Sequence, residues 1–259
     1  MMRYPQDNVL NGRYHVETVV TMTECSTIYT ATDLVRSREV IVKAARQAHC
    51  NYAEHCLACW SLVHEGLVLR RLVQRTIRAP RYLNQFHVDG RPFLAMTKIR
   101  GQNLEQLRRE ERLSTHQILQ LLIQVCEAVE RLHQLGFVHQ DIKPSNIMVR
   151  PDHAAVLIDW GAAARIRAPG DRRSYGSFTR EFVSPEQVRG EALPGNDIFS
   201  LGRTLDALVP WPSRRLVAIV RKATAPAGKR YASMGELRRD LARLVALDGL
   251  TSLFDLAAI

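Results

Sequence analysis

Four polar side chains suited to phosphoryl transfer stand close together in this sequence. Asp141, Lys143 and Asn146 lie in the segment HQDIKPSNIMV, and Asp159 follows in VLIDWG. Transfer of a phosphoryl group needs a carboxylate at the attacking hydroxyl, a cation near the phosphate, and oxygen ligands for magnesium. The set supplies all three kinds of group. It stands between an apolar helical pattern and an apolar strand-like run, which would position it.

The first part of the chain favours β-structure with one helix among the strands. Val40–Ala44 and Phe93–Ile99 are rich in β-forming residues, and Asp89-Gly90 before the second run is a hairpin signal. Between these runs, apolar spacing predicts a helix over Ala53–Val73.

The rest of the chain favours helices. Ser114 and Gln117 form a capping-box pattern, Gly136 marks the end of that helix, and Ser233 and Glu236 form a second capping box. The apolar positions at helical spacing are Ile118, Leu122, Val125, Val129 and Leu132, then Ile198, Leu201, Leu205 and Leu208, then Leu237, Leu241 and Leu244. A β-rich lobe followed by a helical lobe, an α+β fold, is therefore expected.

These motifs resemble those of the eukaryotic-like (Hanks-type) protein kinase family, especially its bacterial Ser/Thr kinases. The resemblance runs from about Asn11 to Leu244, and several separate motifs occur in the family's order. It implies the two-lobed protein-kinase fold. The parts would be a single kinase domain over 1–259, with an N-lobe over 11–97, a hinge over 98–101, and a C-lobe over 102–259 that has a shortened αG region.

The resemblance implies roles for the chemical residues. Asp141 would be the catalytic base, Lys143 would contact the transferring phosphate, and Asn146 and Asp159 would hold Mg²⁺. Thr179 would face the substrate site. The residues implied to be structural are Glu186 and Arg230, as a buried ion pair, and Asp197, as a brace for the catalytic-loop backbone.

The resemblance also implies an ATP site. Lys43 resembles the lysine that grips the nucleotide phosphates, Glu65 resembles its glutamate partner, and Met96 stands at the gatekeeper position. The remaining ATP-binding positions are Thr21, Thr23, Ser26, Ile41, Lys98 in the hinge, and Met148.

Two features of the expected ATP site depart from the family pattern. Thr21, Thr23 and Ser26 stand where the family has three phosphate-covering glycines, although Thr is bulky and stiff. Either the hydroxyls partly replace the backbone contacts, or the loop does not cover phosphate. Ile41 replaces a small residue that lies over adenine, and would narrow the pocket.

A further departure concerns the activation segment, and FVSPEQ, Phe182–Gln187, resembles the end of that segment. Gln140 replaces the Arg that normally meets a phosphate on this segment. The hypothesis is a non-RD kinase whose activity does not require phosphorylation of that segment. Ser174, Ser177 and Thr179 remain candidate phosphorylation sites.

A cluster of Cys and His precedes Glu65. Cys50, Cys56, Cys59 and His64 have spacings that allow a zinc site or a redox sensor. The competing interpretation is a packed apolar helix face that includes Cys56, Cys59 and Trp60.

Charge and composition bound the class of protein. The formal net charge is +10, and Ser213–Arg243 holds nine basic residues against Glu236 and Asp240. This region is either a solvated helical surface or a docking face for an acidic protein, a membrane surface or a nucleic acid. No nucleic-acid motif accompanies it, so nucleic acid ranks lowest.

Nothing in the sequence suggests a membrane span or secretion. No apolar run approaches the roughly 18 residues that span a bilayer, and the N-terminus has no apolar core of a secretory signal. The cysteine count of five is odd, which favours reduced thiols and a cytoplasmic protein.

Three functions are open on these residues. The leading one is an ATP- and Mg²⁺-dependent Ser/Thr protein kinase acting on protein substrates. The basic surface would suit acidic substrates. The second is a pseudokinase that serves as a scaffold or regulator, favoured by the loop and Ile41. The third is a small-molecule phosphotransferase, against which Thr179, Glu186 and Arg230 argue.

Overall fold

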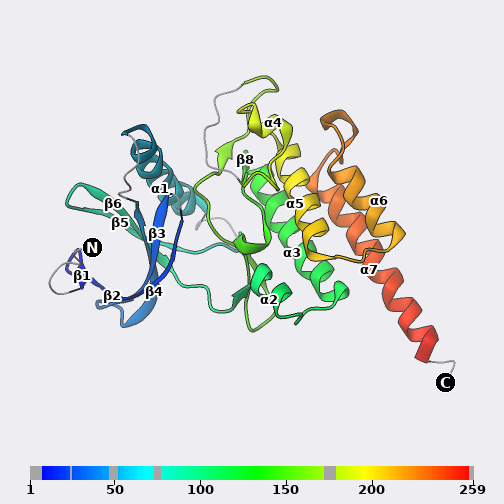
Figure 1. The fold of residues 1–259 in the computed structure, drawn as a ribbon, viewed down its shortest axis with the longest axis horizontal. Coiled ribbons are helices and arrows are strands. Elements are labelled where there is room, and N and C mark those ends of the chain that lie inside the picture. The colour runs from blue at the N-terminus through cyan, green and yellow to red at the C-terminus, as the bar shows by residue number, and fades with distance from the viewer. Residues whose placement is uncertain (1–7, 24, 47–51, 73–76, 172–178, 257–259) are drawn as a thin grey trace. The chain divides into compact units, whose positions relative to one another are not determined.

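A computed structural model describes residues 8–23, 25–46, 52–72, 77–171 and 179–256, without the side chains of 52–56, 72 and 248–256. The chain divides into two compact units, Met1–Ile99 and Arg100–Ile259. The division lies inside the hinge expected from the sequence. The first unit is mainly a sheet and the second is mainly helical, which confirms the α+β class (Figure 1).

The first unit is an antiparallel sheet with one long helix. The sheet has the order β1-β2-β3-β4-β6-β5. Its strands are β1 Val9–Leu10, β2 Tyr14–Met22, β3 Ser26–Asp33, β4 Arg38–Ala45, β5 Tyr82–Val88 and β6 Arg91–Thr97. Helix α1, Tyr52–Leu72, packs on β4, β5 and β6.

The sheet curls around an aromatic stack. Tyr14 of β2 stacks on Phe86 of β5, and Phe86 stacks on Phe93 of β6, each with ring centroids 5.4 Å apart. Since β2 and β5 lie near opposite edges of the sheet, this stack joins the two edges on one face. Strands β5 and β6 are joined by Asp89 and Gly90, both with positive φ, which confirms the expected hairpin.

The second unit is a group of packed helices. Its helices are α2 Leu104–Arg109, α3 Thr115–Gln134, α4 Pro185–Val188, α5 Pro194–Leu208, α6 Arg214–Ala223 and α7 Met234–Leu256, with 3₁₀ turns η1 Pro144–Asn146 and η2 Ala227–Lys229. Helix α3 packs on α7 and on α5. The apolar positions expected on α3, α5 and α7 are all buried.

Two small sheets hold the loops of the second unit. One has the order β10-β9-β7, and the other pairs β11 with β8. Their strands are β7 Gln102–Asn103, β8 Phe137–Val138, β9 Ile147–Val149, β10 Ala155–Leu157 and β11 Ala164–Arg165. Gly101, with φ +129°, approaches the Val149 carbonyl so closely that a Cβ would lie 1.9 Å from its oxygen. Only glycine fits there.

The helix caps follow the sequence, with one correction. Ser114 and Gln117 form the reciprocal capping box at the start of α3, as expected. At α7 the Ser233 hydroxyl caps the Glu236 amide, but the Glu236 carboxylate accepts from Ala232 and not from Ser233. The expected second capping box is therefore only half formed.

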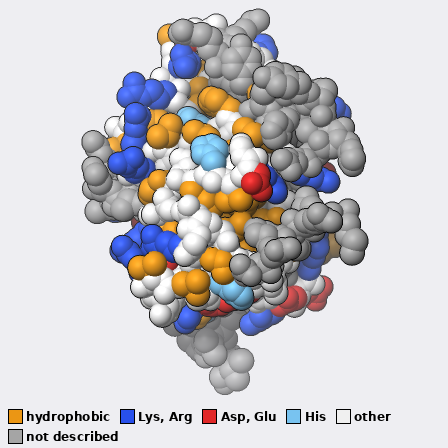
Figure 2. Space-filling model, turned by 90° about the vertical axis from the view of Figure 1, so that its left-hand side faces the viewer, with side chains coloured by type: hydrophobic (Ala, Val, Ile, Leu, Met, Phe, Trp, Pro, Cys, Tyr) orange, Lys and Arg blue, Asp and Glu red, His pale blue; other side chains and the backbone are white. Residues whose placement is uncertain are grey.

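Figure 2 shows the face of the molecule that lies to the left in Figure 1. Apolar side chains lie in its middle, Lys and Arg lie mostly toward its rim, and acidic side chains are few. Exposed apolar side chains described in the first unit include Val20, Met22, Leu34 and Val35. Such scattered apolar exposure is common on protein surfaces and does not by itself define a site.

Candidate active site

A buried ion pair joins the sheet and the helix of the first unit. The Lys43 ammonium on β4 lies 2.9 and 3.0 Å from the two carboxylate oxygens of Glu65 on α1. Only 6% of Lys43 and 2% of Glu65 is exposed. The strand and the helix thus bring together two residues that are 22 positions apart, and the pairing fixes the direction of the Lys43 side chain.

The side chains near Lys43 in the expected ATP site share its face of the sheet. Ile41 precedes Lys43 by two residues on β4, so both point to the same side. Met96 is the cross-strand partner of Ile41 on β6 and lies on that side too. The opposite face carries the aromatic core. A branched Ile41 side chain is therefore presented beside Lys43, at a position where the family has a small residue.

The loop that replaces the glycine-rich turn is closed by its own hydroxyl groups. Thr23 Oγ1 accepts a hydrogen bond from the Ser26 amide at 3.0 Å and lies 3.1 Å from Ser26 Oγ. The Arg46 guanidinium donates to the Thr23 carbonyl at 3.0 Å. Thr21 pairs with Ile28 within the β2–β3 ladder. The hydroxyls of Thr23 and Ser26 thus stabilise the turn between these strands.

The expected catalytic residues of the second unit lie in one cluster. Asn146 Nδ2 donates to the Asp141 carbonyl at 2.9 Å and to Asp141 Oδ2 at 2.7 Å. The Lys143 ammonium lies 2.9 Å from Asp141 Oδ2 and donates to Thr179 Oγ1 at 2.8 Å. Turn η1 between Lys143 and Asn146 folds the loop back, so these side chains converge. A carboxylate, an ammonium and a hydroxyl are therefore in direct contact.

Asp197 of α5 holds the backbone that precedes Asp141. Its carboxylate accepts hydrogen bonds from the amides of His139 and Gln140 at 2.9 and 2.8 Å, and it lies 2.8 Å from His133 Nε2. Burial raises the pKa of Asp197, but the hydrogen bond with His133 and the other partners outweigh it and leave the pKa below its usual range. Asp197 is thus an ionised brace.

Two non-glycine residues of this region have left-handed backbone. Gln140, immediately before Asp141, has φ +66°, and Asp159 has φ +63°. Such conformations are uncommon for residues with a Cβ and persist where the surroundings hold them. For Gln140, the hydrogen bonds that the His139 and Gln140 amides donate to the Asp197 carboxylate stabilise this backbone conformation.

His139 is an uncharged buried residue beside the catalytic cluster. Its ring lies edge-on to the buried Trp160, with centroids 4.6 Å apart, and its Nδ1 accepts from the Asp141 amide at 3.3 Å. Burial lowers the pKa of His139, although the neighbouring carboxylates oppose that effect. The ring therefore supports the Asp141 backbone as a neutral imidazole.

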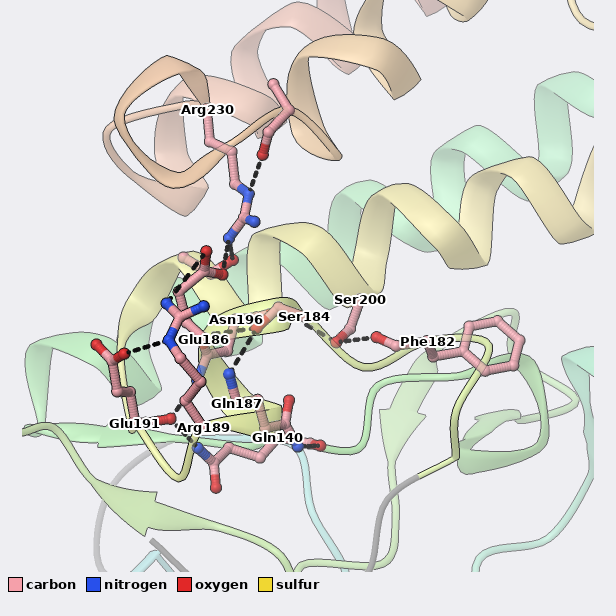
Figure 3. Close-up of polar contacts among 12 residues, drawn as sticks. Gln140, Phe182, Ser184, Glu186, Gln187, Arg189, Glu191, Asn196, Ser200 and Arg230 are labelled. Carbon is pink, nitrogen blue, oxygen red and sulfur yellow. Dashed lines mark hydrogen bonds and ion pairs between the residues drawn. The ribbon is translucent and has the colours of Figure 1, made fainter. Parts of the chain in front are cut away.

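Gln140 links the catalytic loop to the segment around α4. In Figure 3 the Gln187 side chain reaches the Gln140 backbone, and the Gln140 side chain extends toward Glu191. Gln187 Nε2 donates to the Gln140 carbonyl at 2.6 Å, and Gln140 Nε2 donates to the Glu191 carbonyl at 3.2 Å. Gln140 is 4% exposed. The residue that stands in place of an Arg thus makes neutral, buried contacts to the backbone of the neighbouring segment.

The expected ion pair of the second unit is present. Arg230 Nη1 donates to Glu186 Oε2 at 2.8 Å and to the Gly195 carbonyl at 3.2 Å (Figure 3). Both residues are buried. Arg189, which is half exposed, reaches Glu186 at 3.9 Å and Glu191 at 3.0 Å. The buried Arg230 guanidinium therefore ties α4, the start of α5 and the η2 turn together.

The other residues predicted for the site lie partly within and partly outside the described residues. Lys98 forms an exposed ion pair with Glu39 at 3.0 Å, and Met148 lies half-buried in β9. Ser174, Ser177 and Cys50 lie outside the described residues, and the side chain of Cys56 does too. No group of three or more metal-ligating side chains is found in the part of the chain that the structure describes, which includes Cys59 and His64.

The competing interpretation of the Cys/His helix needs a correction. Trp60 was expected on a packed apolar face, but half of it is exposed and it stacks on His64 with centroids 4.8 Å apart. The buried face of α1 instead carries Ala58, Leu62 and Glu65. The Glu65–Lys43 pair orients the helix, so this face meets the sheet and Trp60 does not.

The donor set fits a Mg²⁺ ion. Asp159 supplies a carboxylate and Asn146 an amide oxygen, which are the hard ligands that Mg²⁺ prefers together with phosphates and waters. Asn146 uses Nδ2 to bind Asp141, and its Oδ1 is the atom that remains for a metal. With only these two protein ligands, the remaining positions would be filled by nucleotide phosphates and waters.

Sequence reasoning missed several partners in this site. His133, Gln187 and Glu191 each contact Asp197 or Gln140 across more than 40 positions of the chain. Asn196 is fully buried and bonds to Ser184 and to the Glu191 carbonyl. Gln187 and Asn196 lie directly beside the motif residues Glu186 and Asp197, but their own side chains carry no chemical signature, so only the packing of α3, α4 and α5 reveals these contacts.

The chain belongs to the protein kinase family, because the model of the protein kinase domain matches residues 14–214. Similar proteins are bacterial. Probable serine/threonine-protein kinase PknB of Corynebacterium glutamicum is 29% identical over 78% of this chain and 32% of its own length. PknL of Mycobacterium tuberculosis is 32% identical over 75% of this chain and 48% of its own length. PknA of that species is 28% identical over 74% and 46%. The chain spans less than half the length of each.

None of the described helices is both long and apolar enough to cross a bilayer.

Proposed function

We propose that this chain is an ATP- and Mg²⁺-dependent Ser/Thr protein kinase. The observation that supports this most directly is the Lys143 ammonium, which contacts both the Asp141 carboxylate and the Thr179 hydroxyl. This arrangement supplies a base, a cation for the phosphate and a link to the segment that would face the substrate. Membership of the family and its Ser/Thr kinase relatives point the same way.

The proposed reaction is in-line transfer of the γ-phosphoryl group. The substrate hydroxyl oxygen bonds to the γ-phosphorus, the bond to the bridging oxygen breaks, and ADP leaves with that electron pair. Asp141 orients the hydroxyl and takes its proton, while Lys143 neutralises developing charge and Lys43, held by Glu65, positions the phosphates. Mg²⁺ held by Asn146 and Asp159 would neutralise phosphate charge when bound.

Protein hydroxyls are the proposed acceptors. The segment around α4 is bound to the catalytic loop by Gln187 and to the η2 turn by the Glu186–Arg230 pair. A held segment of this kind suits recognition of an extended protein substrate more than of a small molecule. A cytoplasmic location is proposed from the odd cysteine count.

The test is phosphate transfer, followed by intact mass. Purified protein with ATP and Mg²⁺ should gain mass in phosphate steps, and Asp141→Asn and Asp159→Asn should gain none within the time that the wild type needs for its first phosphate. Removing the base should slow transfer by about 10²- to 10⁴-fold. If the protein gains no mass and an ATP titration also shows no Mg²⁺-dependent binding, the proposal fails.

The second candidate is a pseudokinase, and the closed turn between β2 and β3 favours it. Thr23 and Ser26 bind one another and are therefore poorly placed to bind phosphate. A Thr23→Gly/Ser26→Gly variant would allow closer backbone approach to phosphate. Under the kinase proposal, this variant should bind ATP several-fold more tightly than the wild type. If neither protein binds ATP, the pseudokinase candidate is preferred.

A non-RD mode of activation is also proposed. Gln140 uses its amide on the Glu191 carbonyl, a contact that needs no phosphate. Ser174→Ala/Ser177→Ala should therefore keep its transfer rate on an external substrate. Thr179→Ala is measured separately, because Thr179 contacts Lys143. A loss of activity in the double variant without unfolding would refute this mode.

A further inference from the structure

One tryptophan of the second unit is almost fully exposed. Trp211 stands in the short segment between α5 and α6, flanked by Pro210 and Pro212, and 92% of it is exposed. Large aromatic side chains usually bury most of their surface. Trp160, in contrast, is fully buried in the same unit. Trp211 therefore presents apolar area that the fold itself does not use.

The chain next to Trp211 carries only positive charge. No Asp or Glu lies between Asp206 and Glu236. In that interval Arg214, Arg215 and Arg221 are exposed, and none of them has an ion pair within the described residues. At the N-terminal edge, Asp206 is already paired with Arg203 at 2.8 Å.

Helix α6 directs these charges to solvent on one side. Its buried residues are Leu216, Ile219 and Ala223, and it packs on α5 and α7 (Figure 1). At 100° per residue, Arg214 and Arg221 lie opposite the buried side of the helix, and Arg215 and Lys222 lie between that position and the buried side. We call Arg214, Arg215, Arg221 and Lys222 the α6 basic face.

Local helix energetics do not explain this face. Arg214 and Arg215 occupy the first turn of α6, where the helix dipole disfavours cations. Among these four cations, Lys222 alone has a partner within the described part of the chain, since its ammonium lies 4.0 Å from the centre of the Tyr231 ring. The other cations gain little within the fold, so their charge is available to a partner.

We propose that Trp211 and the α6 basic face bind an acidic segment of another protein. Carboxylates would pair with the guanidinium groups, and one apolar side chain would pack on Trp211. Both contacts are typical of protein interfaces, in which Trp and Arg are enriched. This partner surface is distinct from the catalytic cluster and does not depend on phosphoryl transfer.

Two other anionic partners fit less well. A membrane-binding helix inserts an apolar face, but the apolar face of α6 is buried against the fold and leaves only Trp211. Single-stranded nucleic acid is usually held by several aromatic side chains among the cations. Tyr231, the next aromatic residue after α6 in the chain, is buried. One aromatic side chain beside four cations suits an acidic peptide.

The test is a calorimetric titration of the full chain at low salt. The probe is a short capped peptide of Asp and Glu with one central Leu. Arg214→Glu/Arg215→Glu and Trp211→Ala are compared with Arg36→Glu/Arg108→Glu, which makes the same charge change at two exposed arginines elsewhere. Thermal melting checks that every variant is folded. Phosphatidylserine vesicles and an oligothymidylate are titrated in parallel.

The expected result is saturable peptide binding that weakens as salt rises. Arg214→Glu/Arg215→Glu should weaken binding by about tenfold or more and Trp211→Ala by several-fold, while the control pair should change it by less than about twofold. Equal weakening by the control pair would mean an effect of net charge and would overturn the proposal. Absence of saturable peptide binding, or tighter binding of the vesicles or the oligothymidylate, would overturn it too.

Discussion

At the residue scale, the energetic effect of the Lys43–Glu65 ion pair depends on its burial. Both side chains are almost fully buried, and the Lys43 ammonium lies 2.9 Å from a carboxylate oxygen of Glu65. Removing one partner of such a pair leaves an uncompensated charge in the interior. The pair therefore contributes to the stability of the first unit as well as to the proposed nucleotide site.

Glu65→Gln should lower the free energy of unfolding by about 3 kcal/mol, because the variant removes the buried negative charge in contact with the Lys43 ammonium. Urea unfolding followed by circular dichroism measures this change. The control is Glu39→Gln, whose partner Lys98 is partly exposed, and it should cost less than about 1 kcal/mol. If the two variants lose the same free energy of unfolding, burial does not strengthen the effect of the Lys43–Glu65 pair.

His139 should make the protein sensitive to acid. Because burial lowers its pKa, the folded state binds fewer protons there than the unfolded chain does below about pH 6.5. Stability from this residue is therefore present above that pH and is lost as the pH falls through the folded-state pKa. His139→Phe keeps a ring beside Trp160 but cannot titrate.

The measurement is the melting temperature of wild type and His139→Phe at about pH 8 and about pH 5.5, on either side of the ordinary imidazole pKa. The variant should lose fewer degrees on acidification, even if it is less stable at both values. A loss as large as that of the wild type would assign the acid sensitivity to other groups.

At the element scale, local sequence signals place the long described helices α1, α3, α5 and α7 and the strands β4 and β6. Asp89-Gly90 adopts the positive φ that a tight hairpin needs, and Ser114 with Gln117 caps α3 at both backbone positions. These features depend on neighbours within a few residues, so the sequence predicts them well. The half-formed capping box at Ser233 shows that the pattern did not predict the partner of the Glu236 carboxylate.

Ser114→Ala should destabilise the protein by about 1 kcal/mol, because the Gln117 amide loses its cap. Chemical denaturation gives the value. Thr115→Ala removes a neighbouring exposed hydroxyl and should change stability by less than about 0.5 kcal/mol. A larger effect at Thr115 than at Ser114 would contradict the capping role.

At the scale of the whole molecule, buried contacts join segments that are distant in the chain. Arg230 pairs with Glu186 across 44 positions, and Gln187 reaches Gln140 across 47. These bonds tie the segment around α4 to the helices and to the catalytic loop. The arrangement of the proposed active site in the second unit depends on them.

Arg230→Ala should lower the free energy of unfolding by about 3 to 5 kcal/mol, since Glu186 would remain buried without its main countercharge. Arg189→Ala is the matched control, because Arg189 also approaches Glu186 but is half exposed, and it should cost less than about 1 kcal/mol. Urea midpoints compare the two. Similar losses would mean that the buried pair is not the main tie.

The sequence by itself determined the α+β class and the long helices, and it named the residues that are proposed to carry the chemistry. Apolar periodicity and turn residues act over a few neighbouring residues. Motifs such as HQDIKPSNIMV are recognised from their residue types and spacing alone. Only the tertiary structure decided that Trp60 is exposed, that Thr23 and Ser26 close a turn, and that Gln140 binds the Glu191 carbonyl. These outcomes depend on which distant surfaces pack together, and no local pattern records that.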